Sequence, residues 1–402
     1  MKKRIAILGC GTTGIHLTYE LLSERRYDVT IFTPQSSEEV RSGRIRSTQV
    51  HFSSTIAREH RYHMPEWPNA QELHAVHVSV GGHTLFAGPL DKPAYSVDQR
   101  LYFSKCMHHL ERQGVRFVYD KVSFDDLSRL VEQFDLVVDC TGRAGPVAPF
   151  PLDSSLSPLS SPLRKCNVGY FLGVKTAEPI GIIAHIIPGE GELFEIPALT
   201  ERGPVTILFV EAIPGRKLDV FDKTQNAHDF CSIILNLTES FFPEIRERIN
   251  VSQFRLCDEL AYLRVAIRPK VHTPYCTVNG KWVVGCGDSV VLNDPITGQG
   301  DNTCSYMTEA LFFALMEDID STWDESTFQR YWDTTKPYVR HVVGWSHAMM
   351  QPLPKPILDM IMKGSENPAV ARRIANWFRI PSSAYNDFFH ENDMHQNTWG
   401  EK

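Results

Sequence analysis

The sequence predicts an α/β protein that has a discontinuous Rossmann-like dinucleotide-binding domain, an inserted and mostly antiparallel β-sheet, and a helical C-terminus. Two observations carry this prediction. A glycine-rich G-x-G-x-x-G motif spans residues 9–14, directly after an apolar strand and at the start of a helical pattern. Strand-like runs separated by Pro-Gly and Arg-Gly-Pro turns then fill residues 166–213, between two segments with the pattern of a nucleotide fold.

The first unit of the nucleotide fold lies at residues 4–33. Residues 4–8 form a short apolar run bounded by glycine, and a second run of β-branched and aromatic residues ends at Phe32. Apolar residues recur between the two runs at roughly helical spacing. We therefore expect one βαβ unit whose glycine loop joins the first strand to the helix.

Each glycine of the loop has its own expected role. Gly9 permits the tight turn, Gly11 lets a pyrophosphate approach the backbone, and Gly14 lets the helix pack closely on the strand. The helix N-terminus offers N–H groups to the phosphates, and Thr13 belongs to the same candidate cofactor site. A bare structural turn is the alternative, and the strand–helix context makes it the weaker interpretation.

The acidic residue that usually ends the second strand of such a unit is absent. Thr33-Pro34-Gln35 stands there instead, so the customary acceptor for the ribose 2′-OH has no obvious candidate. Another element holds the adenosine, or a nearby polar residue substitutes for the carboxylate. The candidates for that substitution are Gln35, Arg41, Arg44 and Arg46.

The pattern of a nucleotide fold continues after residue 98, is interrupted by the inserted strands, and resumes near residue 270. Five prolines and many serines in residues 146–164 indicate a linker. Helices are expected over 98–113, 225–240 and 302–317, and strands over 115–119, 135–140, 168–174, 182–187, 205–211 and 282–285. This order predicts a nucleotide-binding domain at 1–75, 98–165 and 270–345, a substrate domain at 76–97 and 166–269, and a helical segment at 346–402.

Composition narrows the class of protein. The 402 residues carry a formal net charge of −7, which gives no electrostatic basis for binding nucleic acid or an anionic membrane. Nine cysteines without a C-x-x-C pair or a Cys/His cluster predict neither a disulfide framework nor a metal site. With no apolar run of signal-peptide or membrane-spanning length, we expect a cytoplasmic protein.

Three distant sites favour FAD over NAD as the dinucleotide. Asp288 follows a late strand, where its carboxylate can accept from ribose or ribityl hydroxyls, and Arg100 at a helix start could reach the pyrophosphate. The turn at 294–302 precedes a long helix, whose dipole would stabilise negative charge on a reduced flavin ring. The turn contributes four candidate cofactor residues, namely Pro295, Gly298, Gly300 and Asn302.

The order of these motifs resembles the group A flavoprotein monooxygenases of the para-hydroxybenzoate hydroxylase type. The order is the glycine loop, V-D-x-R-L-Y at 97–102, C-T-G at 140–142, G-D at 287–288 and D-P-x-x-G-x-G at 294–300. The chain is more closely similar to the oxygenase component of styrene and indole monooxygenases. Further shared segments are P-E-W-P at 65–68, Gly81-Gly82, G-x-G-E-L at 189–193 and E-I-P at 195–197.

The resemblance implies a two-component enzyme. A separate NADH:flavin reductase would supply reduced FAD, and the oxygenase would react it with O₂ to give a C4a-hydroperoxyflavin that epoxidises an aromatic alkene. Such chemistry needs a dry pocket rather than acid or base residues, so no catalytic side chain is expected. The possibility of a homodimer stays open.

The resemblance also implies the substrate-side residues Ser47, Gln49, His51 and Ala94. Ser47, Gln49 and Ala94 are similar to the indole group of the family, whereas His51 is similar to the styrene group. We therefore expect indole, or a similar bicyclic aromatic, in preference to styrene. The alternative is that Ser47 and Gln49 simply alternate along a strand with one wet face.

Three other functions compete with this one. A single-component aromatic hydroxylase would take NADH directly, and a non-catalytic FAD-fold protein would act as a binding module. An NAD-dependent dehydrogenase is disfavoured by the missing acidic residue and by the inserted sheet.

Overall fold

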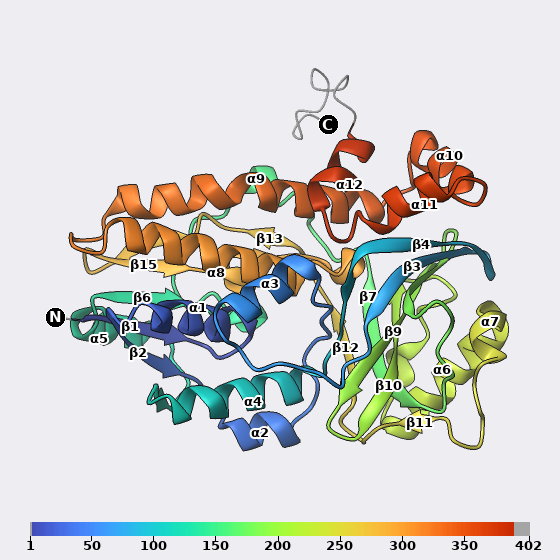
Figure 1. Cartoon of the computed structure of the whole chain (residues 1–402), viewed down its shortest axis with the longest axis horizontal. Helices are drawn as coiled ribbons and strands as arrows, with labels where there is room; N and C mark the ends of the chain where they lie inside the picture. The colour runs from blue at the N-terminus through green and yellow to red at the C-terminus, as the bar shows by residue number, and fades with distance from the viewer. Residues whose placement is uncertain (1, 390–402) are drawn as a thin grey trace.

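The computed structural model describes residues 2–389 and contains two large sheets that lie side by side (Figure 1). The first is a six-stranded sheet in the order β14-β15-β6-β1-β2-β5. All its neighbouring strands are parallel except β14, which pairs antiparallel with β15. Its strands are β1 (Lys3–Leu8), β2 (Tyr27–Phe32), β5 (Arg116–Val118), β6 (Leu136–Asp139), β14 (Tyr275–Val278) and β15 (Lys281–Gly285).

The second sheet has the order β11-β7-β10-β9-β8-β3-β4, with β12 also paired to β7. Its pairs are antiparallel except β3 with β8, so the prediction of a mostly antiparallel inserted sheet is confirmed. Its strands are β3 (Leu73–Val80), β4 (His83–Ala94), β7 (Lys165–Leu172), β8 (Gly181–Ile187), β9 (Gly191–Thr200), β10 (Gly203–Ala212), β11 (Arg255–Leu256) and β12 (Tyr262–Ala266). A short third sheet pairs β13 (Lys270–Val271) with β16 (Val291–Leu292).

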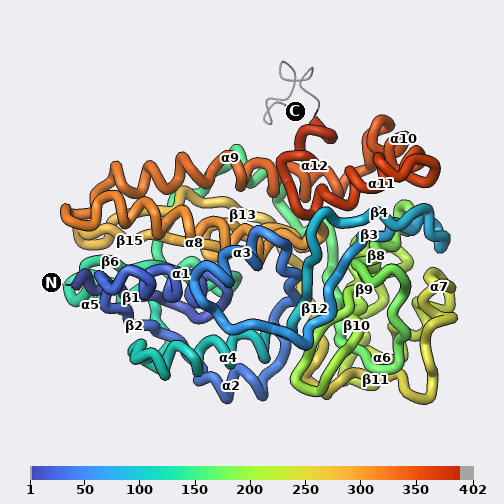
Figure 2. The backbone as a smooth tube through the Cα atoms, in the orientation of Figure 1, coloured from blue at the N-terminus to red at the C-terminus, as the bar shows by residue number. Residues whose placement is uncertain are grey.

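The tube in Figure 2 shows how two distant parts of the chain build the second sheet. The β3–β4 hairpin comes from residues 73–94 and the other strands from residues 165–266. Residues 76–97 belong to the predicted substrate domain, but the hairpin itself was not predicted, because Gly-Pro at 88–89 interrupts the strand pattern. β9 was also not identified.

Three helices stack over the parallel sheet. α1 (Thr12–Ser23) packs against α8 (Gly300–Glu317), which packs against the long α9 (Glu325–Met349), as Figure 1 shows. α8 begins two residues before the predicted start at 302. On the same face as α1 lies α4 (Gln99–Arg112), and α5 (Phe124–Gln133) packs near β14 and β15.

The second sheet is covered on both faces. Apolar residues of α10 (Lys355–Gly364) and α11 (Pro368–Ala375) share one core with β3, β4 and β7. A Cβ at Gly88 of β4 would collide with the carbonyl oxygen of Ala371, so α11 packs directly on the strand backbone. On the other face, α6 (Ala227–Phe241) and α7 (Pro243–Arg246) enclose a second core.

The C-terminal helices continue through α12 (Pro381–Phe388), which packs against α9. The predicted helical segment 346–402 is thus helical over most of its described part, and residues 390–402 lie outside the described residues. Between the two sheets, the predicted linker at 146–164 contains only the short 3-10 helix η2 (Ser154–Leu156). Within residues 2–389, no helix is long and apolar enough to cross a membrane.

Candidate active site

The glycine loop leaves β1 at the centre of the parallel sheet and enters α1. Gly9 has a φ of +106°, and a Cβ there would collide with the carbonyl oxygen of Cys140 at the end of β6. A Cβ at Gly14 would collide with the carbonyl oxygen of Gly9. Both positions therefore need glycine for close packing of the protein itself.

Asp288 lies on a second turn that is packed against this loop. Gly287 follows β15 with a φ of +66°, and a Cβ there would collide with the hydroxyl oxygen of Thr13. Burial raises the pKa of Asp288 to about 6, against a weak bond from the Cys304 thiol, whose Sγ lies 3.6 Å from Oδ1. The structure therefore packs Thr13 against Gly287, the residue that precedes Asp288.

The turn at 294–302 follows β16 of the short third sheet and leads into α8. Asp294 accepts a hydrogen bond from the Ile296 amide at 3.1 Å and caps the 3-10 helix η5 (Pro295–Thr297). Gly298 follows in the left-handed conformation with a φ of +64°, which favours glycine. Gly300 is the first residue of α8.

The Asn302 side chain joins this turn to the segment that carries the predicted substrate residues. Its Oδ1 accepts from the Phe52 amide at 3.1 Å and from the Thr55 hydroxyl at 2.8 Å. Its Nδ2 donates to the carbonyl oxygens of Val50 at 2.9 Å and Gly298 at 3.2 Å. A contact between Asn302 and the cofactor stays a prediction, since these four bonds occupy its side chain.

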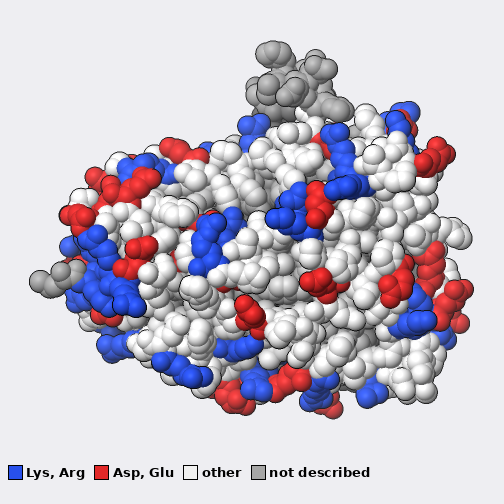
Figure 3. All heavy atoms as spheres, in the orientation of Figure 1, with Lys and Arg blue, Asp and Glu red and all other residues white. Residues whose placement is uncertain are grey.

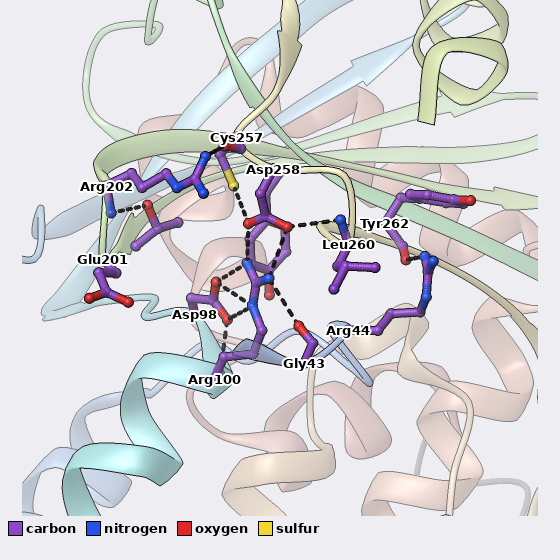
Figure 4. A network of polar contacts seen from close by, with 12 residues as sticks. Gly43, Arg44, Asp98, Arg100, Glu201, Arg202, Cys257, Asp258, Leu260 and Tyr262 are labelled. Atoms are coloured by element: carbon purple, nitrogen blue, oxygen red, sulfur yellow. Dashed lines mark hydrogen bonds and ion pairs between the residues drawn. The ribbon is translucent and has the colours of Figure 1, made fainter. Parts of the chain in front are cut away.

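Arg100 lies at the junction of α4 with the second sheet (Figure 4). Its guanidinium donates to Asp98, to both carboxylate oxygens of Asp258 at 3.1 and 2.9 Å, and to the Gly43 carbonyl at 3.2 Å. Burial alone would lower the pKa of Arg100, but these two carboxylates outweigh it and raise the pKa. The predicted pyrophosphate contact stays a prediction, and it would require these ion pairs to open.

Three arginines were candidates to replace the acidic residue that is missing at the end of β2. Two of them contact residues in or next to strands of the second sheet instead. Arg41 pairs with Glu201, and Arg44 donates to the Tyr262 carbonyl at 3.0 Å. Arg46 instead donates to the Gln35 side chain just after β2. The Arg46–Gln35 pair is therefore the candidate that stands where the carboxylate would be.

The predicted substrate residues lie in different environments. We call residues 44–52 the substrate-side segment. No strand forms over residues 44–50. Ser47 is exposed, whereas Gln49 is buried and neither atom of its side-chain amide has a hydrogen-bond partner among the described residues. Ala94 is buried in the core under α11.

His51 is fully buried, and both of its ring nitrogens face carboxylates. Nδ1 lies 2.5 Å from Oε1 of Glu59, and Nε2 lies 3.5 Å from Oδ2 of Asp301. Burial alone would lower the pKa of His51, but the two carboxylates outweigh it and raise the pKa to about 9. The ring also stacks on Tyr95 with the centroids 5.0 Å apart.

Comparison with known proteins places this arrangement in a family. Residues 142–248 match the family model "Styrene monooxygenase A putative substrate binding domain". Over 314 residues the chain is 37% identical to styrene monooxygenase StyA of a Pseudomonas species and 36% identical to StyA of Pseudomonas fluorescens. Each alignment covers 76% of this chain and 75% of the relative. The chain belongs to the styrene monooxygenase family.

The architecture of this styrene monooxygenase homologue is also found among solved structures. The crystal structure of PqsL, described as "a probable FAD-dependent monooxygenase" from Pseudomonas aeruginosa, superimposes with a TM-score of 0.65 at 16% identity. The match covers 91% of this chain and all of PqsL. The predicted fold and the resemblance to a flavin-dependent monooxygenase are therefore both confirmed.

Membership of the styrene monooxygenase family implies FAD, and the described residues fit it. A Cβ on Gly11, Gly298 or Gly300 would meet no atom within 4 Å, in contrast to Gly9 and Gly14. The backbone at these three positions therefore borders open space, at the glycine loop and at the start of α8. FAD bound there would supply the redox chemistry with oxygen, while the chain supplies backbone N–H groups and a helix dipole.

Two buried residues of this styrene monooxygenase homologue were not identified from the sequence as site residues. Glu59 lies on α3 (Ser53–Arg61), a helix that sequence analysis did not predict. Asp301 lies in the turn at 294–302 but was not among its predicted cofactor residues. The His-x-x-x-x-x-x-x-Glu spacing of His51 and Glu59 gives no local signal, and Asp301 contacts His51 only in the folded protein.

Proposed function

We propose that this chain is an oxygenase that takes reduced FAD from a separate NADH:flavin reductase and uses O₂ to epoxidise an aromatic alkene, with indole preferred over styrene. The family supports the oxygenase, and the curated relatives are themselves named styrene monooxygenases. The position of the open space beside Gly11, Gly298 and Gly300, at the N-terminal ends of α1 and α8, is the observation that supports flavin binding at this site. A single G-x-G-x-x-G motif is consistent with the reductase being a separate protein.

Gln49 is the residue that supports the proposed preference for indole. Its buried side-chain amide has no partner in the described chain, and a buried unsatisfied amide costs about 1–3 kcal/mol. Indole carries an N–H that can donate to the Gln49 Oε1, whereas styrene carries no hydrogen-bond donor. A bound indole would therefore remove part of that cost, and a bound styrene would not.

Oxygen transfer places modest demands on the chain. The substrate pocket must exclude water and hold the alkene at the reactive face of the flavin. No acid–base residue is required of the chain at the reacting carbon atoms, so we assign no catalytic side chain.

The test uses the purified full chain with FAD, NADH and O₂, with and without a generic flavin reductase, and with catalase to remove free peroxide. Indole, styrene and a thioether are offered separately and together, and the products are identified by chromatography. We expect oxygenated products only when the reductase is present, with indole giving blue indigo. Rapid NADH oxidation without the reductase would instead support a single-component hydroxylase. Absence of any oxygenated product would support a non-catalytic flavin-binding protein.

A further inference from the structure

A continuous series of buried polar side chains connects the glycine loop with the substrate-side segment. We call it the buried chain, and every one of its members is less than 10% exposed. The members come from four segments that are distant in sequence. They are Thr12 of α1, Asp301 of α8, His51 of the substrate-side segment and Glu59 of α3.

The contacts along the buried chain are direct. The Thr12 hydroxyl donates to Oδ1 of Asp301 at 2.5 Å, and Nδ1 of His51 lies 2.5 Å from Oε1 of Glu59. The link between the two halves is the 3.5 Å gap from Nε2 of His51 to Oδ2 of Asp301. Neither of those two atoms has a hydrogen-bond partner in the described part of the chain. Each is thus left as the other's nearest electrostatic partner.

The surroundings of His51 contain further titratable groups, and the cation Arg58 of α3, which is paired with Glu309, also acts on the neighbouring His16. Beyond the two carboxylates, His51 faces His16 of α1, Tyr102 of α4 and Tyr95, which follows β4. Both tyrosine hydroxyls donate to Glu59, Tyr102 at 2.7 Å, so they remain neutral donors. Burial lowers the pKa of His16, although Glu59 acts in the opposite direction. Burial would raise the pKa of Glu59, but His51 outweighs it and lowers the pKa to about 2.

We propose that the buried chain couples the phosphate-binding loop to the substrate-side segment, with Glu59 as the positioning residue that keeps His51 a cation between the two carboxylates. This inference rests on the proposed binding of FAD at the glycine loop. Thr12 adjoins Gly11, where the backbone borders open space, so Asp301 holds its negative charge beside the place for the phosphates. The His51 cation neutralises that charge.

Loss of the His51 charge would therefore act at both ends of the buried chain. At the loop, an uncompensated Asp301 carboxylate would repel the phosphates of FAD. At the substrate-side segment, His51 would lose the attraction that holds it against α8. Because coupling between two sites is reciprocal, a substrate that fixes the segment would also tighten FAD binding.

The experiment measures FAD affinity between pH 6 and 9.5, with oxidised FAD by fluorescence anisotropy and with dithionite-reduced FAD under argon. It compares the unchanged chain with Glu59→Gln. The unchanged chain keeps the His51 cation until the pH approaches 9, so its affinity should be flat from pH 6 to 8 and fall above that. Glu59→Gln removes one of the two carboxylates that raise the His51 pKa, so its affinity should already fall, by roughly 5- to 10-fold, between pH 6 and 8.

Glu309→Gln is the matched control. Glu309 also joins α8 to α3, through Arg58 at 2.7 Å and Arg61, but it lies outside the buried chain. Its pH profile should therefore coincide with that of the unchanged chain. Circular dichroism establishes that each variant is folded.

Three results would contradict the proposed coupling through the buried chain. A Glu59→Gln profile that coincides with the unchanged chain would overturn the coupling, and so would a Glu309→Gln profile that shifts equally. Should Glu59→Gln not fold, NMR titration of the His51 ring in the unchanged apo chain, assigned with His51→Gln, replaces it, and a midpoint near 6.5 overturns the proposal. Failure of the unchanged chain to bind either form of FAD at any pH would instead refute the proposed function itself.

Discussion

At the scale of single residues, the three glycines of the loop divide into two kinds. Gly9 and Gly14 are glycines because the protein backbone occupies the space where a side chain would lie. Gly11 is different, since nothing in the protein would contact a Cβ there. The first kind serves the fold and the second leaves room for a ligand, although all three belong to one motif.

A pair of alanine substitutions separates these two roles. Gly14→Ala should lower the free energy of unfolding by about 1–3 kcal/mol, because its Cβ must displace the Gly9 carbonyl. Gly11→Ala should change it by less than about 1 kcal/mol and weaken FAD binding by roughly 5- to 150-fold. Urea denaturation and FAD titration measure the two quantities. Equal stability of the two variants would contradict the assignment.

Gln49 makes the corresponding prediction on the substrate side. Gln49→Leu keeps the volume of the side chain but removes the amide, so indole should lose roughly 5- to 30-fold in kcat/KM while styrene is unchanged or improved. Competition between the two substrates measures the ratio, and styrene serves as the internal control. An unaltered product ratio would remove Gln49 from the pocket.

At the scale of elements, the start of α8 is tied to the segment that precedes α3. The side-chain amide of Asn302 forms this connection with both its oxygen and its nitrogen. The turn at 294–302 and the substrate-side segment are therefore held in one geometry. The amphipathic pattern of α8 predicts the helix itself. Only the fold shows that its first turn also positions a loop 250 residues earlier in the chain.

Asn302→Ala should therefore affect both stability and binding. We expect a loss of about 1–3 kcal/mol, because buried donors and acceptors are left unpaired, and a clear loss of FAD affinity. Asn376 is the matched control, as it is also buried and bonds to Asp91, Pro89 and Arg372, none of which belongs to the turn at 294–302. Asn376→Ala should lose similar stability, measured by thermal denaturation, and retain FAD affinity. Equal affinity losses in the two variants would mean that Asn302 acts only through stability.

At the scale of the whole molecule, paired charges join the nucleotide-binding part to the second sheet. Arg100 of α4 reaches Asp258, which follows β11, and this bidentate pair crosses between the two parts (Figure 4). Elsewhere acidic and basic side chains are interspersed over the face seen in Figure 3. Most surface pairs of that kind contribute little to stability.

Asp258→Asn should lower the free energy of unfolding by about 1–3 kcal/mol at neutral pH, since a charge-assisted bidentate pair is lost. Burial would raise the pKa of Asp258, but Arg100 outweighs it and lowers the pKa. The contribution is therefore present above the ordinary aspartate pKa and is lost as the pH falls through the lowered value. Asp222→Asn, at an exposed pair with Lys165, is the control and should leave the urea denaturation midpoint almost unchanged.

The sequence by itself determined the fold class, the glycine loop, the turn at 294–302 and the family, because each depends on residues that are close together along the chain. Turn glycines, strand runs and helical spacing are local patterns, and such patterns predict the elements one after another along the chain. The hairpin β3–β4 escaped this reading because Pro89 and Gly88 break its alternation.

Only the tertiary structure decided what surrounds His51 and Arg100. The sequence predicted each as a contact for a ligand, yet in the fold Glu59 and Asp301 face one and Asp98 and Asp258 bind the other. A buried charge must find its counter-charge within a few ångströms, and that partner can lie anywhere in the chain. Asp301 lies 250 residues from His51 and Asp258 lies 158 from Arg100, distances in sequence that no local pattern spans.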